Sequence, residues 1–176
     1  MNSRGLRIAF GYRARVGKST SVNYLISKYS GIELSFAKPV YDIAAYFQMT
    51  CDFPVEKDRE LLQFIGGYAR SKNPDIWLNI MKRQIDRIES HDELFNSRPT
   101  NIFISDLRYP NEAEFLKNNG FTLVNIERDT SNINFQGGDR NHSSELSLKC
   151  YNYWNNVIVN DSSLDNLYDE LNRIIL

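Results

Sequence analysis

The chain has 176 residues, a length that suits one domain with its own hydrophobic core. Hydrophobic residues make up 41% and charged residues 24%, which excludes a disordered, collagen-like or low-complexity chain. The net charge of −1 gives the whole protein no electrostatic reason to bind nucleic acid or a membrane surface, and two cysteines are too few for a disulfide framework or a zinc site. We therefore expect a protein of the reducing cytoplasm.

Apolar runs and helically spaced apolar residues alternate along the chain. In chain order, the predicted elements are a strand (6–10), a helix (19–29), a strand (32–36), three helices (39–49, 58–66, 75–90), a strand (101–105), a helix (110–119), two strands (121–126, 156–159) and a helix (162–175). Residues 50–57 and 91–100 are expected to be loops. The strands are continuous apolar runs, which favours an α/β fold with a parallel sheet covered on both faces.

Residues 8–20 (IAFGYRARVGKST) are the most informative segment, because a strand leads through a glycine-containing loop into a helix that begins Gly-Lys-Ser-Thr. This is the layout of a phosphate-binding P-loop. Lys18 would reach the outer phosphates and the Ser19 hydroxyl would bind Mg²⁺. Five residues separate Gly11 from Gly17 where the motif has four. Either the loop is one residue longer, or Tyr12 occupies the usual position of the first glycine.

Basic residues dominate the first 32 positions, which contain no acid. They are Arg4, Arg7, Arg13, Arg15, Lys18 and Lys28. This bias fits a solvated basic face or a local anion site.

Charged residues also follow two later strands. Asp106 and Arg108 come just after the strand at 101–105, and Arg128 follows the strand at 121–126. The carboxyl ends of parallel strands face one ligand crevice, so Asp106 could serve the metal and the arginines could neutralise phosphoryl charge. A surface Asp–Arg pair and a solvated arginine are the alternatives.

Several ordered segments resemble the phage-type deoxynucleoside monophosphate kinases, a branch of the P-loop nucleotide kinases. They are FGYRARVGKST (10–20), SFAKPVYDIA (35–44), LLQFIGGYAR with NPDIWL (61–78), SDLRYPNEAEFLKNNG (105–120), NIERD (125–129) with NHSSE (141–145), and VNDSSLDNL (159–167). The resemblance implies transfer of the γ-phosphoryl group of ATP to a deoxynucleoside monophosphate, with Mg²⁺, by a three-layer P-loop kinase fold whose five-stranded sheet has the order 2-3-1-4-5. It also implies a viral origin, and then the cytoplasm of the host.

The resemblance, taken together with the loop and the charges at the strand ends, gives the candidate site residues. The catalytic residues would be Lys18, Asp106, Arg108 and Arg128. The residues that bind ATP would be Arg13, Ala14, Arg15, Val16, Gly17, Lys18, Ser19, Thr20, Asn160 and Asp161. The acceptor would contact Lys38, Gln63, Arg70 and Trp77, and Mg²⁺ would be held by Ser19 and Asp106.

We expect residues 1–176 to form a single kinase domain, with an acceptor-binding helical region at about 38–90 and a lid at about 129–142. The expected partners are small nucleotides, with a homodimer as a further possibility. Two other functions fit the same ATP site. One is a kinase for another small phosphorylated metabolite such as phosphomevalonate, and the other is a nucleotide-binding protein without catalysis.

Overall fold

The computed structural model describes residues 4–129 and 147–175. Within them, five parallel strands form one sheet in the order β2-β3-β1-β4-β5. The strands are β1 (Arg7–Gly11), β2 (Ile32–Leu34), β3 (Ile102–Leu107), β4 (Thr122–Glu127) and β5 (Asn156–Val159). This result confirms the predicted α/β fold and the strand order 2-3-1-4-5.

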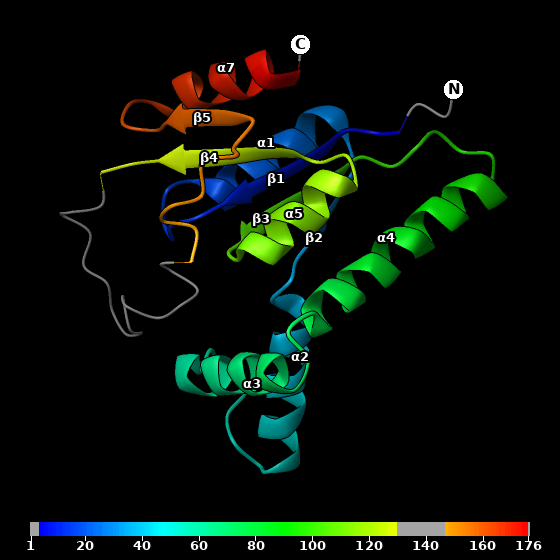
Figure 1. Cartoon of the computed structure of the whole chain (residues 1–176), viewed down its shortest axis with the longest axis vertical. Helices are drawn as coiled ribbons and strands as arrows, with labels where there is room; N and C mark the ends of the chain where they lie inside the picture. The colour runs from blue at the N-terminus through cyan, green and yellow to red at the C-terminus, as the bar shows by residue number, and fades with distance from the viewer. Residues whose placement is uncertain (1–3, 130–146, 176) are drawn as a thin grey trace.

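Helices cover both faces of the sheet, so the strands are buried on two sides (Figure 1). The helices are α1 (Lys18–Tyr29), α2 (Lys38–Thr50), α3 (Arg59–Lys72), α4 (Ile76–Leu94), α5 (Pro110–Asn118) and α7 (Leu164–Ile175). Ile8 and Phe10 of β1 pack with α1 and α7, whereas Ala9 points to the other core, which contains residues of α4 and α5. Two separate cores on a parallel sheet explain why the strands are continuous apolar runs.

Helices α2 and α3 and the start of α4 form a helical region that extends beyond the sheet (Figure 1). Trp77 joins this region to the core, since its side chain is only 3% exposed and lies in the α4–α5 core. Its indole N–H donates to the carbonyl oxygen of Gly66 in α3, at 3.4 Å. The region therefore rests on the core through a large buried aromatic side chain.

The ends of several elements differ from those predicted. Strand β2 ends two residues early because the backbone turns after Leu34, and the N–H groups of Phe36 and Ala37 donate to Asp106. Strand β3 extends through the polar Ser105 and Asp106 to Leu107. Helix α3 continues through two glycines to Lys72, and α4 continues through polar residues to Leu94. Neighbouring elements and solvent exposure, which local composition does not reveal, set these ends.

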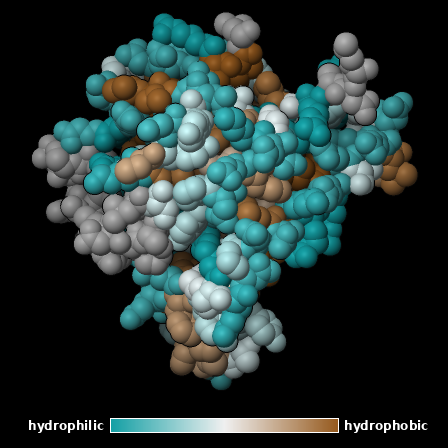
Figure 2. All heavy atoms as spheres, viewed as in Figure 1, coloured by the Kyte–Doolittle hydropathy of each residue, from teal (hydrophilic) through white to brown (hydrophobic). Residues whose placement is uncertain are grey.

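Apolar side chains are exposed over α2 and α3, where Figure 2 shows brown and tan atoms at the lower tip of the molecule. The larger ones on these helices are Tyr41, Ile43, Tyr46, Phe47, Met49, Phe64 and Tyr68, and Phe53 and Val55 lie in the loop that joins the helices. None of the helices in the parts of the chain that the structure describes is long and apolar enough to cross a membrane.

Replacing Trp77 by alanine should lower the free energy of unfolding by about 3–5 kcal/mol, because it removes a large buried side chain and leaves a cavity. Leu94→Ala is the matched control, since Leu94 is 78% exposed at the end of the same helix and should change stability by no more than about 0.5 kcal/mol. Urea unfolding followed by circular dichroism measures both. A loss below about 1 kcal/mol for Trp77→Ala would contradict the buried position of this side chain.

Candidate functional site

The loop after β1 and the segment after β3 lie side by side at the carboxyl edge of the sheet. Gly11 is paired with Leu107 across the two strands, and the Tyr12 N–H donates to the Leu107 carbonyl oxygen at 3.1 Å. The loop that leads to Lys18 therefore leaves the sheet next to Asp106 and Arg108. Because all five strands are parallel, the ends of β4 and β5 lie at this same edge.

The backbone of the loop indicates how its unusual spacing is accommodated. Tyr12 has a φ of 73°, in the left-handed region that favours glycine, and Gly17 has a φ of 111°. Gly11 is still part of β1. Tyr12 thus takes the backbone conformation of a loop glycine, and four residues separate it from Gly17. The structure favours the second of the two alternatives left by the sequence.

Gly17 lies against Asn160, which follows β5. A Cβ on Gly17 would come within 2.6 Å of the amide nitrogen of Asn160. That amide donates to the carbonyl oxygen of Val16 at 2.8 Å, while the backbone N–H of Asn160 donates to the Glu127 carbonyl at 2.7 Å. Asn160 therefore supports the loop through the Val16 carbonyl group and connects it to the end of β4.

Lys18 opens α1 with its side chain mostly buried, at 7% exposure. Its ammonium group donates to the carbonyl oxygens of Tyr12 and Arg13, so the charge is held at the loop. Helix α1 has neither a side-chain cap nor an acidic residue in its first turn. The positive end of the helix dipole and the amide groups there favour an anion.

The basic residues among the first 32 positions do not all lie at the loop. Arg13 and Arg15 are exposed on the loop beside Lys18. By contrast, Arg7 begins β1 at the opposite edge of the sheet, where it pairs with Glu89 and donates to the Asn119 carbonyl at 2.9 Å. Lys28 lies in the last turn of α1, away from the loop. Only part of the basic bias therefore contributes to an anion site.

Asp106 accepts three hydrogen bonds from the connection between β2 and α2. The Ser35 hydroxyl donates to Oδ2 at 2.7 Å, the Ala37 N–H donates to the same oxygen at 2.8 Å, and the Phe36 N–H donates to Oδ1 at 3.1 Å. Oδ1 keeps more accepting capacity than Oδ2. Asp106 therefore secures the start of the helical region, and its carboxylate is fixed in direction.

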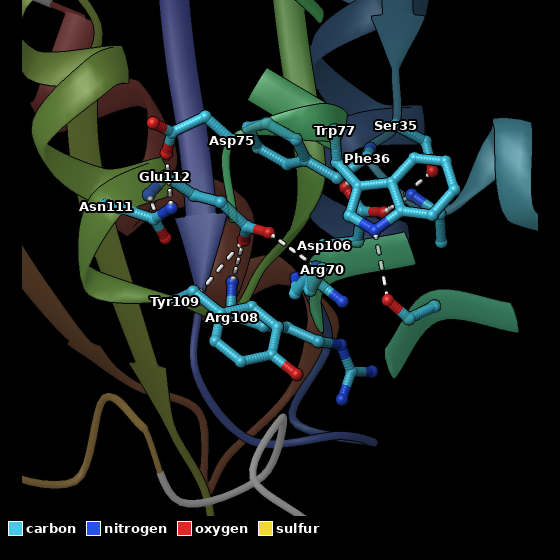
Figure 3. A network of polar contacts seen from close by, with 12 residues as sticks. Ser35, Phe36, Arg70, Asp75, Trp77, Asp106, Arg108, Tyr109, Asn111 and Glu112 are labelled. Carbon is cyan, nitrogen blue, oxygen red and sulfur yellow. Dashed lines mark hydrogen bonds and ion pairs between the residues drawn. The ribbon is translucent and has the colours of Figure 1, made fainter. Parts of the chain in front are cut away.

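A second carboxylate, Glu112, forms a network that the sequence analysis did not single out (Figure 3). One oxygen accepts from the N–H groups of Arg108 and Tyr109, at 3.0 and 3.1 Å, and the other accepts from Arg70 Nη2 at 3.0 Å. Burial raises the pKa of Glu112 to about 7, although the Arg108 N–H and the Arg70 charge act in the opposite direction. The sequence does contain a signal for this role. Glu112 is the third residue of a helix that begins with Pro110, and a glutamate at that position indicates an N-terminal cap.

The remaining candidate residues have varied positions. Lys38 is exposed and pairs with Asp42 on its own helix, Gln63 is half-buried on α3, and Trp77 is buried as described above. Arg128 and Asp161 are exposed just beyond the ends of β4 and β5. Except for Asp129, the predicted lid at 129–142 lies outside the described residues.

Glu112 should make stability depend on pH with a defined sign. Its pKa is raised from 4.5 to about 7 in the folded protein, so the folded state binds the proton more tightly than the unfolded state. The stabilisation is fully present below pH 4.5 and is lost as the pH rises through about 7, a change of about 3 kcal/mol.

Because other groups titrate too, the measured quantity is the difference in free energy of unfolding between wild type and Glu112→Gln, by urea unfolding from pH 4.5 to 8. Between pH 4.5 and 8, wild type should lose about 3 kcal/mol of unfolding free energy relative to Glu112→Gln. Glu114→Gln, on the exposed side of the same helix, should leave the wild-type profile unchanged. A flat difference for Glu112→Gln would contradict the raised pKa.

Together, the parallel sheet and the lysine-containing loop between β1 and α1 define an α/β protein of the P-loop class. A sequence profile described as "Deoxynucleotide monophosphate kinase" matches residues 58–171, more than half of the chain. The chain belongs to the deoxynucleotide monophosphate kinase family.

Two viral relatives extend this result. The chain is 26% identical to a protein of Acanthamoeba polyphaga mimivirus named "Putative deoxynucleotide monophosphate kinase", with 88% of each chain covered. It is 29% identical to "Uncharacterized protein ORF77" of Ictalurid herpesvirus 1, with 98% of this chain and 71% of the relative covered. The similarity to the mimivirus protein thus extends over regions outside the profile match.

Proposed function

We propose that this protein transfers the γ-phosphoryl group of ATP to a deoxynucleoside monophosphate, forming ADP and the deoxynucleoside diphosphate. An oxygen of the acceptor phosphate would attack the γ-phosphorus as the bond to the β-phosphate oxygen breaks. The observation that carries the proposal is the hydrogen bond between Tyr12 and Leu107, which joins the Lys18 loop to the Asp106–Arg108 segment at one edge of the sheet. Family membership supports the choice of acceptor.

The donor phosphates would bind to the loop at residues 13–20. Its amide groups, the start of α1 and the Lys18 ammonium supply positive potential, to which the exposed Arg13 and Arg15 add. Asn160 and Asp161 would lie toward the adenine side of ATP. The contact between Asn160 and the loop gives Asn160 a second task, because it supports the backbone on which the phosphates would rest.

The residues present fit a magnesium ion bound mainly through nucleotide phosphates. The described residues contain no group of three or more His, Cys, Asp or Glu side chains that could hold a metal on its own. Mg²⁺ in kinase sites needs only one or two protein oxygens, since phosphates and water complete its shell. The exposed Ser19 hydroxyl and the remaining capacity of Asp106 Oδ1 would hold it. The bound ion would neutralise phosphate charge.

The acceptor would bind between the sheet edge and the helical region at about 38–90, within a single domain of residues 1–176. Arg70 supports this assignment, because its side chain is 27% exposed and its guanidinium contacts Glu112 and Tyr109, beside the segment after β3. Lys38 and Gln63 would contact the acceptor from α2 and α3. Buried Trp77 would shape the pocket by holding α3 and α4 together.

Catalysis by such a site depends on positioning and charge, since phosphoryl transfer needs little covalent help from the protein. Lys18, Arg108 and Arg128 would neutralise the charge of the phosphoryl group in transit, and Asp106 would act through the metal shell. No separate general base is assigned.

A coupled assay of ADP formation with each of the four deoxynucleoside monophosphates tests the proposal. Turnover that depends on one or more of them is expected. Turnover only with another phosphorylated metabolite would support a different kinase, and ATP binding without turnover for any acceptor would support a non-catalytic nucleotide-binding protein. Either of the last two results would overturn the proposal.

We also propose a homodimer that acts in the cytoplasm, of the host if the protein is viral, on small nucleotides and not on nucleic acid or membranes. The exposed apolar side chains of α2 and α3 support self-association. Sedimentation equilibrium should give twice the chain mass, and a single-chain mass would exclude the dimer.

A further inference from the structure

Glu112 is an acidic side chain in a place where a charge is hard to accommodate. It lies in the first turn of α5 and is only 2% exposed. A buried carboxylate is tolerated when its oxygens are hydrogen-bonded and a cation is near. Glu112 has both, and its partners come from two parts of the chain.

The two carboxylate oxygens of Glu112 have different hydrogen-bond partners. Oε2 accepts from the backbone N–H groups of Arg108 and Tyr109, which fixes the path of the chain directly after β3. Oε1 accepts from Arg70 Nη2 on α3, which is 42 residues away in the sequence. Capping α5 requires only Oε2, so the helix cap does not account for the second contact.

Arg70 is held from two sides by this one segment. Its guanidinium carbon lies 4.0 Å from the centre of the Tyr109 ring, while Glu112 binds one of its terminal nitrogens. The planar fork carries five N–H donors, so a guanidinium fixed in this way can also bind a phosphate. Figure 3 shows Arg70, Arg108 and Glu112 in one cluster.

We infer that Glu112 is a positioning residue for the acceptor phosphate: it holds the Arg70 guanidinium toward that phosphate and fixes the backbone of Arg108 beside it. The inference rests on the proposed function, because that function makes Arg70 an acceptor-binding residue. Glu112 joins the helical region to the β3–α5 segment and thereby sets the distance between the two arginines. It acts through these groups and does not touch the substrate.

The replacement Glu112→Gln separates positioning from capping. A glutamine amide has one oxygen, which can still accept from the Arg108 and Tyr109 N–H groups, and one NH₂ group, which cannot accept from Arg70. Helix α5 should therefore keep its cap while Arg70 loses its partner. Circular dichroism at pH 7 should show an unchanged fold.

The expected result is a rise of about ten- to a hundredfold in the Kd and KM for the deoxynucleoside monophosphate, the range for losing a hydrogen bond between charged groups. The KM for ATP should stay the same. Glu114→Gln, an exposed substitution on the same helix, is the matched control and should change neither constant. A merely structural defect would affect both substrates alike.

A double-mutant cycle tests whether Glu112 acts through Arg70. Arg70→Ala should weaken acceptor binding, and adding Glu112→Gln to it should produce little further loss. Calorimetry with each of the four deoxynucleoside monophosphates, without ATP, measures binding independently of turnover. Effects that multiply in the double variant, or an acceptor Kd unchanged by Glu112→Gln, would overturn the inference.

The same measurements distinguish this inference from the proposed function. If wild type turns over an acceptor and Glu112→Gln binds it normally, the inference fails and the function stands. If wild type binds a monophosphate that Glu112→Gln binds weakly, yet transfers no phosphoryl group, the inference stands and the kinase function fails. If wild type neither binds nor turns over any of the four, both fail.

Discussion

Lys18→Ala should leave the protein folded and lower kcat in the proposed reaction by about a thousandfold or more. The Lys18 ammonium is held at the loop by the carbonyl oxygens of Tyr12 and Arg13, so it is already placed where the donor phosphates would lie. Charge that is oriented in advance contributes most to the transition state, because little reorganisation is needed as the reaction proceeds.

Steady-state kinetics with saturating ATP and acceptor measures this effect, and circular dichroism checks the fold. Lys82→Ala is the control, since Lys82 is exposed on α4 and should retain full activity. Near-normal turnover by Lys18→Ala would show that the phosphate loop has been assigned to the wrong residues.

The second large effect is expected at Arg108, where replacement by alanine should lower kcat by about a hundred- to a thousandfold with a small change in KM. The Arg108 backbone N–H is bound by Glu112, and the residue follows β3 directly beside the loop that carries Lys18. A guanidinium at this point would neutralise charge that develops as the phosphoryl group moves. Arg108→Lys should recover only part of the rate, since an ammonium group lacks the planar fork.

The comparison is with Arg83→Ala, an exposed arginine on α4 that should behave as wild type. Separate kcat and KM values for both substrates decide the role of Arg108. A pure rise in KM would assign Arg108 to binding in the ground state instead of the transition state.

Much of the fold could be predicted because it depends on short-range patterns. The strand at 156–159 and the start of the helix after the loop agree with the structure to within one residue, since apolar runs bounded by turns mark buried strands. Two of the boundary errors, at the ends of β2 and β3, lie at the site. The predicted strand continues through Ser35 to the apolar Phe36, but hydrogen bonds from these two residues to Asp106 hold them outside β2.

The candidate site was predictable only in part. Lys18, Ser19 and Gly17 stand together in the sequence, so their motif is visible without a structure. The sequence identifies Asp106 as a carboxylate at the end of a strand. Its three hydrogen bonds from residues 35–37 become visible only when β2 and β3 lie side by side. Glu112 looked like an ordinary helix residue.

The sequence by itself determined the parallel α/β sheet and the lysine loop after its first strand, because these features follow from apolar runs and from neighbouring residues. The tertiary structure alone decided which charges meet. Arg70 and Glu112 are 42 residues apart, and only packing of α3 near α5 brings them to 3.0 Å and buries the carboxylate. Burial raises the pKa of Glu112 to about 7, a property that desolvation confers and residue type does not.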